Sequence, residues 1–362
     1  MKKQKTILLG MSGGVDSSVA ALILKKQGYN VIGVFLKVYS NAKNKFTGEC
    51  LYLDELKIAK KISALLDIPL IFLDFEKEYK KNILKPMLKS YSLGKTPNPD
   101  IACNKIIKFP ILWKIAKKYN ADYIATGHYA KIKKTLQGYK LLAGEDKSKD
   151  QSYFLSDLSQ KDLSHTIFPL GNLKKQNVRK IAKQNKFPNW NKHGTTGICF
   201  IGEQNMQKFL KRKIREKPGI VKTPEGKVIG THKGIFFYTI GQKTGTHIGI
   251  EIKKPINLSQ KRFYIAEKKL KSNVLIVAPE SHPSLAKKQV FLKNLHFINP
   301  KEKIPPHLKA RIRHLGELHD GALKKSKKYI FIFSKLVEAI AEGQYIVLYH
   351  KNQLIANAEI KL

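Results

Sequence analysis

The segment from Lys5 to Val38 reads KTILLGMSGGVDSSVAALILKKQGYNVIGVFLKV, and its order of residue types decides the fold. Lys5–Gly10 and Val31–Val38 are short apolar runs containing β-branched residues, which predicts two buried strands. Between them, Asp16–Gln27 predicts a helix that ends at Gly28. A strand, a glycine-rich loop, a helix and a second strand in this order predict the opening of an α/β domain with a parallel sheet.

The same alternation of strands and helices continues along the first half of the chain. Further strands are expected at Leu70–Leu73 and Asp122–Thr126. Further helices are expected at Asp54–Asp67, at Glu76–Tyr91 with Pro86 inside it, at Asn104–Tyr119 with Pro110 inside it, and at Lys174–Asn185. This alternation implies a parallel sheet with helices on both faces.

After about residue 203 the pattern changes to short β-branched or aromatic segments separated by Gly, Pro or Lys-rich turns. These segments are Gly219–Val221, Lys227–Ile229, Ile235–Ile240, Arg262–Ala266, Asn273–Val277, Gln289–Leu292, Leu308–Ile312, Tyr329–Phe333 and Gln344–Leu348. We expect two small β-barrel-like domains with a boundary near Pro279–Pro283. The predicted domains are residues 1–203, 204–279 and 280–362.

The charge of the chain favours a polyanionic partner. There are 68 Lys and Arg residues against 27 Asp and Glu, a formal net charge of +41 over 362 residues, and such a field attracts nucleic acid. A lysine-rich composition spread over solvated faces is the alternative explanation, because only six of these residues are Arg. Arg311 and Arg313 are the more informative pair, since arginine offers planar donors to phosphate.

Other classes of protein are disfavoured by composition. No apolar run approaches the length of a membrane helix, and the run Ile7–Gly10 is too short for a signal-peptide core, so we expect a cytoplasmic protein without a membrane partner. The three cysteines, Cys50, Cys103 and Cys199, form no C-x-x-C pair. We therefore expect neither an iron–sulfur cluster nor a structural zinc site.

The loop Gly10–Ser18 has the composition of a phosphate-binding site. Glycines at 13 and 14 let backbone N–H groups approach phosphate oxygens, the helix N-terminus adds a positive field, and Ser12 and Ser17 offer hydroxyls. Asp16 is a candidate Mg²⁺ ligand. The alternative is an ordinary glycine-rich turn with a helix cap. The loop lacks Walker A spacing and resembles the S-G-G-x-D-S signature of ATP pyrophosphatases, which cleave ATP to AMP and pyrophosphate.

Two cysteines have distinctive surroundings. Cys103 directly precedes a helical pattern, with Asp100 or Asn104 as the expected cap and Lys105 beside it, and both the helix field and the lysine favour a thiolate. Cys199 lies in TTGICFIGE (195–203), between glycines. Taken singly, each cysteine is more often a packing residue, and Cys50 keeps that interpretation.

Six blocks together resemble the bacterial tRNA-specific 2-thiouridylase family in order and spacing. They are GMSGGVDSSVAA (10–21), TPNPDIACNKIIKF (96–109), ATGHYAKI (125–132), KDQSYFL (149–155), GICFIGE (197–203) and YTIGQK (238–243), and Gln344 extends the likeness to the C-terminal barrel. The resemblance implies an N-terminal ATP-pyrophosphatase domain. It also implies ATP-dependent thiolation of the wobble uridine, position 34, of tRNAs for Lys, Glu and Gln, with sulfur from a carrier protein.

The resemblance also implies roles for individual residues. ATP would activate the C2 oxygen of uridine by adenylation, a persulfide on Cys199 would supply sulfur, and Cys103 would either free that sulfur or form a disulfide with Cys199. ATP would be bound by Gly10, Met11, Ser12, Gly13, Gly14, Val15, Asp16, Ser17, Leu36 and Gly127. A flipped base would meet Asn98, Pro99 and Asp100, and tRNA would contact His128, Lys149, Asp150, Gln151, Arg311, Ile312 and Gln344.

Departures from the family pattern and rival functions qualify this interpretation. Gly194–Thr195 stands where the family has Asp-Ser, Lys243–Thr246 replaces Arg-x-Gly-Leu, and Pro110 replaces a common glycine. A ligase of the same ATP-pyrophosphatase type acting on a small molecule would explain the loop but not the paired cysteines or the basic barrels. A non-catalytic RNA-binding protein would be marked by loss of Asp16 or a cysteine, and all remain.

Overall fold

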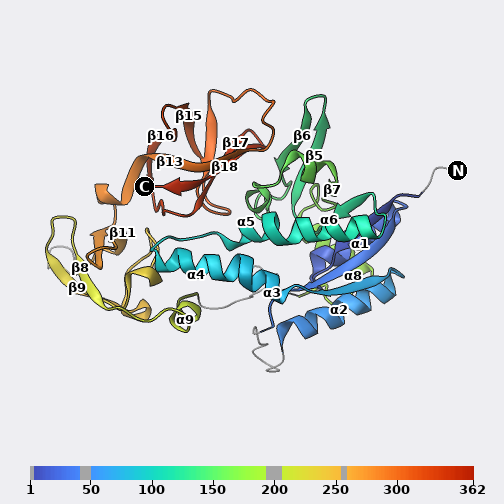
Figure 1. Cartoon of the computed structure of the whole chain (residues 1–362), viewed down its shortest axis with the longest axis horizontal. Helices are drawn as coiled ribbons and strands as arrows, with labels where there is room; N and C mark the ends of the chain where they lie inside the picture. Colours follow the sequence, from blue (N-terminus) through green and yellow to red (C-terminus); the bar gives the residue numbers. More distant parts are fainter. Residues whose placement is uncertain (1–3, 41–49, 193–205, 254–258) are drawn as a thin grey trace.

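A computed structural model describes residues 4–40, 50–192, 206–253 and 259–362, and it places them around three sheets (Figure 1). The first sheet is parallel with strand order β3-β2-β1-β4-β7. Its strands are β1 (Thr6–Gly10), β2 (Asn30–Lys37), β3 (Leu70–Asp74), β4 (Tyr123–Ala125) and β7 (Thr166–Ile167). The predicted parallel α/β domain is confirmed.

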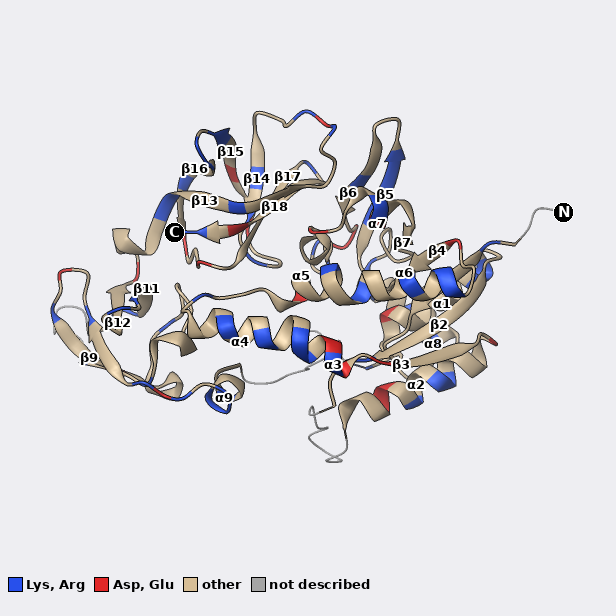
Figure 2. Ribbon diagram, viewed as in Figure 1, with Lys and Arg blue, Asp and Glu red and all other residues tan. Residues whose placement is uncertain are grey.

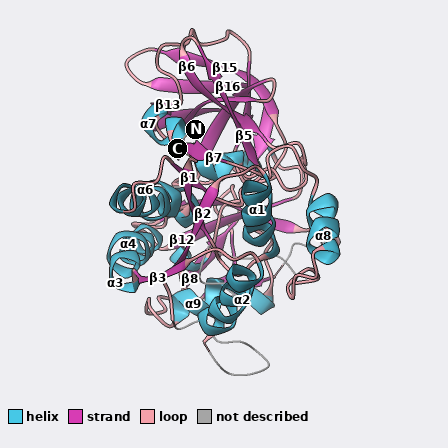
Figure 3. Ribbon diagram, turned by 90° about the vertical axis from the view of Figure 1, so that its right-hand side faces the viewer, coloured by secondary structure: helices cyan, strands magenta, loops and turns pink. Residues whose placement is uncertain are grey.

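Helices cover both faces of this sheet (Figure 3). On one face lie α1 (Val15–Lys26), α2 (Leu51–Leu65) and α8 (Lys175–Gln184). Alternate residues of β1 explain the two layers, because Ile7 and Leu9 pack into the core under these helices while Leu8 faces the core on the other side. Among the described residues no helix is both long and apolar enough to cross a membrane.

The other face is covered by two helical runs that contain the predicted prolines. The first comprises α3 (Glu76–Tyr79), a π-helical turn (Lys80–Leu84) and α4 (Lys85–Ser92); the second comprises α5 (Pro99–Cys103), a π-helical turn (Asn104–Lys108) and α6 (Phe109–Lys118). Each π-turn ends two residues before a proline, Pro86 or Pro110. Proline has no N–H and its ring clashes with the carbonyl of residue i−4, so a widened turn lets the helix continue.

The central domain holds α9 (Met206–Lys211) and a five-stranded sheet of order β10-β9-β8-β12-β11. Its strands are β8 (Gly219–Lys222), β9 (Val228–His232), β10 (Ile250–Ile252), β11 (Phe263–Lys269) and β12 (Val274–Pro279). The predicted strand Ile235–Ile240 is wrong, since Ile235–Phe237 forms a 3₁₀ turn. Phe237 and Tyr238 are buried without sheet pairing, and the Tyr238 hydroxyl donates to the carbonyl of Gly249 at 2.9 Å.

The C-terminal domain is a closed antiparallel barrel in which the first and last strands pair. Its strands are β13 (Ala286–Phe297), β14 (Leu308–Arg311), β15 (His319–Lys325), β16 (Tyr329–Glu338), β17 (Tyr345–His350) and β18 (Gln353–Lys361). A hairpin from the N-terminal half, β5 (Ala130–Thr135) and β6 (Gly138–Ala143), joins this sheet through pairing of β6 with β18. The sequence did not predict this hairpin.

Candidate active site

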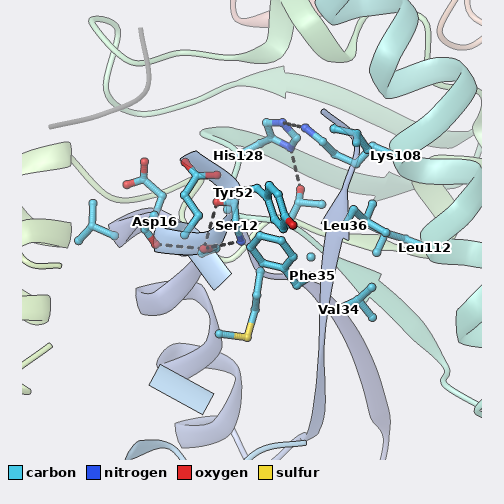
Figure 4. Close-up of a pocket in the computed structure, with 18 of the residues that line it drawn as sticks. Ser12, Asp16, Val34, Phe35, Leu36, Tyr52, Lys108, Leu112 and His128 are labelled. Atoms are coloured by element: carbon cyan, nitrogen blue, oxygen red, sulfur yellow. Dashed lines mark hydrogen bonds between the residues drawn. The ribbon is translucent and has the colours of Figure 1, made fainter. Parts of the chain in front are cut away.

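A pocket of about 240 Å³ lies at the carboxyl ends of β1 and β4 (Figure 4). Strand order reverses here, because β1 pairs with β2 on one side and β4 on the other, and ligands of open α/β sheets bind at such a point. The pocket is lined by the loop after β1, by Leu36 and its neighbours on β2, and by Gly127 and His128 after β4. Of the ten predicted ATP-binding residues, all except Gly13 line it.

The loop between β1 and α1 is shaped for close approach by a ligand. Gly13 has φ of +70°, and a Cβ there would lie 2.2 Å from the carbonyl oxygen of Glu55. The amide of Ser12 donates to the hydroxyl oxygen of Ser17 at 3.2 Å, and that hydroxyl donates to the carbonyl of Gly14 at 3.0 Å. N–H groups in the first turn of α1 have no partner within the helix, so the loop presents donors of the kind that bind phosphate.

Asn189 fixes this loop from a distant part of the chain. Its side-chain amide donates to the carbonyl of Gly13 and to the hydroxyl of Ser18, both at 3.0 Å, and the residue is 1% exposed. No motif surrounds Asn189 in the sequence, so sequence reasoning missed it.

Asp16 lines the pocket and accepts two hydrogen bonds. The Tyr129 hydroxyl donates to its Oδ1 at 2.7 Å, and the ammonium of Lys175 donates to the same oxygen at 2.5 Å. Burial, reinforced by the charge of Asp16, raises the pKa of Tyr129, so the phenol stays a donor at neutral pH. The carboxylate of Asp16 is thereby held in one orientation, toward Tyr129 and Lys175.

The donor set of the pocket fits Mg²⁺ only as a partner of bound phosphates. Asp16 and Glu55 are the carboxylates among the lining residues, and burial raises the pKa of Glu55. Among the described residues no group of three or more His, Cys, Asp or Glu side chains is placed to hold a metal. Mg²⁺ is commonly held by one or two carboxylates together with substrate phosphates and water, which is the arrangement this pocket allows.

Three lysines line the same pocket, and sequence reasoning missed them. Lys108 comes from the π-turn before α6, Lys175 from the start of α8, and Lys192 from the segment after it. Lys192 lies 3.8 Å from a carboxylate oxygen of Glu55. In a chain with 68 basic residues no single lysine is distinctive, so only the fold identifies these. Together they favour a polyanionic ligand.

His128 is a neutral member of the pocket wall. Its Nδ1 lies 2.7 Å from the Thr126 hydroxyl and its Nε2 lies 3.5 Å from the ammonium of Lys108 (Figure 4). Burial, with Lys108 nearby, lowers the pKa of His128 well below its usual value. Because an ammonium only donates, Nε2 acts as the acceptor and we assign the ring proton to Nδ1.

Cys103 is the last residue of α5 and is 1% exposed. The helix is capped by Asn98, whose side-chain oxygen accepts from the amide of Ile101 at 3.2 Å, so the expected caps Asp100 and Asn104 are wrong. Pro99 takes the first helical position, where a residue without an N–H loses no helical hydrogen bond. The side-chain oxygen of Asn98 accepts instead from the third helical residue, Ile101. The ammonium of Lys105 pairs with Asp157 at 2.8 Å, so its charge is shared with that carboxylate.

The remaining cysteines lie elsewhere. Cys50, half-buried, occupies the N-cap position of α2. Cys199, together with Gly194–Gly202, lies outside the described residues, so its predicted approach to Cys103 stays a prediction.

Comparison with known proteins decides the family. Family models match three consecutive parts of the chain: a tRNA methyl transferase HUP domain at residues 5–203, a tRNA methyl transferase PRC-barrel domain at 207–279, and an aminomethyltransferase beta-barrel domain at 287–360. The chain is 39% identical to tRNA-specific 2-thiouridylase MnmA 1 of Geobacillus kaustophilus, over 99% of this chain and 96% of that protein. It is 40% identical to tRNA-specific 2-thiouridylase MnmA of Coxiella burnetii strain Dugway 5J108-111, over 99% of both.

The chain belongs to the tRNA-specific 2-thiouridylase family. A third relative, tRNA-specific 2-thiouridylase MnmA 2 of Aliarcobacter butzleri, is 41% identical over 96% of each chain. The predicted resemblance is confirmed.

The tRNA-contacting residues that the family resemblance implied lie partly in the N-terminal domain and partly in the barrel. Asn98, Pro99 and Asp100 form the half-buried start of α5, and Gln151 lines the pocket, its side-chain oxygen accepting from the amide of Tyr129 at 3.0 Å. Lys149 is exposed on the segment before it. Gln344, half-buried, precedes β17, and Ile312, which follows β14, is 5% exposed.

Asp150 and Arg311, which the resemblance assigned to the same surface, contact each other. The guanidinium of Arg311 donates to Asp150 Oδ2 at 2.9 Å, and the two side chains are 12% and 3% exposed. Asp150 Oδ1 also accepts from the amides of Gly144 and Ser152, each at 3.1 Å. The pair therefore joins the N-terminal domain to the barrel as a buried ion pair.

Proposed function

We propose that this chain is a tRNA-uridine 2-sulfurtransferase that uses ATP to convert the wobble uridine of tRNA to 2-thiouridine. One observation carries the proposal: a glycine-loop pocket with three lysines stands at the switch point of a chain that aligns over 99% of its length with 2-thiouridylases. The proposed domains are residues 1–203 for catalysis, 204–279 as a central β-rich unit and 280–362 as a tRNA-contacting barrel.

The first step is adenylation. The triphosphate of ATP would lie on the amides of Gly10–Ser17 and against Lys108, Lys175 and Lys192, with the adenosine toward Leu36 and Gly127. The C2 oxygen of the uridine attacks the α-phosphate, the bond between the α- and β-phosphates breaks, and pyrophosphate leaves. Mg²⁺, with Asp16 as its protein ligand, would neutralise charge on the phosphates during this step.

The second step is sulfur transfer. The terminal sulfur of a persulfide on Cys199 replaces AMP at C2 of the base, which would lie against Asn98, Pro99 and Asp100. Cys103 would act as the second thiol: its thiolate attacks Cys199 Sγ, which breaks the persulfide S–S bond and forms the Cys103–Cys199 disulfide. This happens either before transfer, freeing hydrosulfide that displaces AMP, or after transfer, releasing 2-thiouridine as the product leaves. A thiol reductant would then restore both cysteines. A carrier protein would deliver the persulfide sulfur in the cytoplasm, and the expected acceptors are tRNAs for Lys, Glu and Gln.

Mass spectrometry of nucleosides tests the proposal. Purified chain is incubated with tRNA, ATP, Mg²⁺ and a persulfide donor, and the digested tRNA should contain 2-thiouridine while the nucleotide products are AMP and pyrophosphate. ADP and phosphate as products would overturn adenylation. Turnover of ATP with a small acid or amine, without tRNA, would instead support a small-molecule ligase.

Cysteine variants separate the two steps. Cys199→Ser should still form AMP in the presence of tRNA but yield no 2-thiouridine, and Cys103→Ser should also lose thiolation. Cys50→Ser is the matched control and should keep full activity. Cys50 occupies the N-cap position of α2 without a side-chain capping bond, and it lies outside the sequence blocks that contain Cys103 and Cys199. Full thiolation by either of the first two variants would refute the paired-thiol mechanism.

A further inference from the structure

A pair of aromatic rings in tilted contact lies outside the nucleotide pocket, where the N-terminal domain meets the barrel. Phe154 lies in a 3₁₀ turn (Ser152–Leu155), and His314 follows β14 of the barrel. Their ring centroids are 4.1 Å apart with planes inclined by 33°. Both residues are half-buried, so neither side chain is wholly enclosed. The pair is a surface feature built by two domains.

The ring pair adjoins the helix that carries Cys103. The side-chain amide of Asn104, the next residue, donates to the carbonyl oxygen of Phe154 at 3.0 Å. Tyr153, which precedes Phe154, forms a side-chain hydrogen bond with Asn98 at the start of the same helix. A ligand resting on the ring pair would therefore be an immediate neighbour of a base held at α5.

Charged groups of both signs lie near the ring pair. The carboxylate of Asp150 favours protonation of His314, whereas Arg311 and Lys149 oppose it. Burial is the larger cause and lowers the pKa of His314 to about 4, so the imidazole is uncharged at neutral pH. A neutral, flat ring with an exposed lysine nearby suits a nucleobase and its phosphate, because the ring can stack on the base and the ammonium can meet the backbone.

Polar atoms around the ring pair lack partners. Within the described residues, the buried atoms Asn104 Oδ1, Arg311 Nε and His314 Nδ1 have no hydrogen-bond partner. Asn104 is 4% exposed, so solvent does not compensate its oxygen. Buried polar groups are nearly always satisfied in a finished structure. These three atoms leave unused hydrogen-bonding capacity at the junction of α5 with the barrel, beside the ring pair.

We propose that Phe154 and His314 form a stacking platform for an unpaired nucleobase of the tRNA anticodon loop that flanks the target uridine. The inference rests on the proposed function and extends it, because it gives the barrel a part in holding the loop open while the uridine is flipped. A flipped base leaves a neighbour without its stacking partner, and the platform supplies a replacement face. The exposed ammonium of Lys149 would meet the phosphates of that neighbour, because the guanidinium of Arg311 is already paired with Asp150.

Fluorescence of 2-aminopurine tests the platform. The probe is placed in an anticodon stem-loop RNA directly before, and in a second RNA directly after, the target uridine, and binding to the full chain with ATP is titrated. The wild-type chain should quench one of the two probes by stacking. His314→Ala should remove most of that quenching and weaken binding about tenfold, whereas His314→Trp should retain both.

His307→Ala is the matched control, since His307 is an exposed histidine at the opposite end of β14. It should quench and bind as the wild type does. Thermal unfolding of each variant shows whether the fold is kept, and His314→Trp keeps the test decisive if His314→Ala is unstable.

Two outcomes would overturn the inference. Unchanged quenching at both positions in His314→Ala would remove the platform and leave the proposed function standing. Failure of the wild-type chain to bind either RNA would overturn the proposed function and the platform together.

Discussion

The nucleotide pocket and the junction of α5 with the barrel are held together by different kinds of contact. In the pocket, Ser12, Gly14 and Ser17 bond to one another across three to five residues of chain, and Lys175 and Asn189 add bonds from distant parts of the chain. The Asp16 side chain there is 32% exposed, whereas that of Asp150 at the junction is 3% exposed. At the junction, Asp150 and Arg311 are 161 residues apart, and the Tyr153 hydroxyl reaches the carbonyl of Tyr345 across 192 residues. Damage to the pocket should therefore impair chemistry within a folded protein, whereas damage to the junction should destabilise the fold.

The largest effect is expected from Asp16→Ala. This change removes the acceptor of Tyr129 and Lys175 and the proposed metal ligand, so AMP formation should fall by at least about 100-fold. The side chain is 32% exposed, so the thermal midpoint should move little. The rate of AMP release measures the loss of activity, and thermal unfolding measures the loss of stability.

Asp320→Ala, at an exposed aspartate of β15, is the control. A large loss of stability in Asp16→Ala would contradict the proposed difference between the pocket and the junction.

Gly13→Ala should be next in size. The new Cβ would meet the carbonyl of Glu55 at 2.2 Å, so the loop must shift and ATP binding should weaken by about tenfold or more. Gly226→Ala is a close control, because Gly226 also has positive φ (+94°) but no atom within 4 Å of the added group. Calorimetric titration with ATP should separate them. Equal ATP affinities in the two variants would count against a phosphate loop at Gly13.

Asp150→Ala should act on stability. Breaking a buried pair by removing one partner typically costs about 3–5 kcal/mol in free energy of unfolding, and here it leaves the Arg311 guanidinium uncompensated. The exposed pair Lys309–Asp320 has side chains 49% and 66% exposed, so Asp320→Ala should cost less than about 1 kcal/mol. Urea unfolding measures both. Similar costs for the two pairs would show that the junction does not hold the domains.

The smallest effect is a pH dependence from His128. Burial holds its folded-state pKa well below the unfolded value near 6.5, so the unfolded chain binds the proton first as pH falls. Stability should be full above about pH 6.5 and should decline below it. His128→Gln should flatten this slope in urea midpoints between about pH 7.5 and 5.5, and His307→Gln, at an exposed site, should not. A slope unchanged by His128→Gln would place the cause elsewhere.

The sequence predicted local features well and long-range features poorly. The parallel strands and the glycine loop follow from contiguous patterns, and the structure places the loop residues together. Ile235–Ile240 misled because its apolar residues are buried by a turn and not by sheet pairing. Asn189 and Lys175 reach the pocket only through the packing of α8 and the segment after it, which no local pattern encodes.

Arg311 shows why a site residue is hard to interpret from sequence alone. Arg-x-Arg suggested a phosphate contact, and the resemblance suggested tRNA, yet the side chain is mostly buried against Asp150 and lies 5.3 Å from the centre of the Tyr349 ring. A residue can belong to an interface while its charge is neutralised by a partner within the protein. The partner of Arg311 is 161 residues away in the sequence, so only the folded structure identifies it.

The hairpin β5–β6 has a consequence for how the protein is made. Its outer edge pairs with Gln353 and Leu354, which leave the ribosome more than 200 residues after Ala143. At ordinary rates of synthesis that edge waits roughly 10 to 40 s for its partner. Lys131, Lys133, Lys134 and Lys140 make the hairpin a poor template for other chains during this interval. We expect newly synthesised chains that end before Gln353 to remain soluble. Replacing these lysines with isoleucine in such truncated chains should cause them to aggregate.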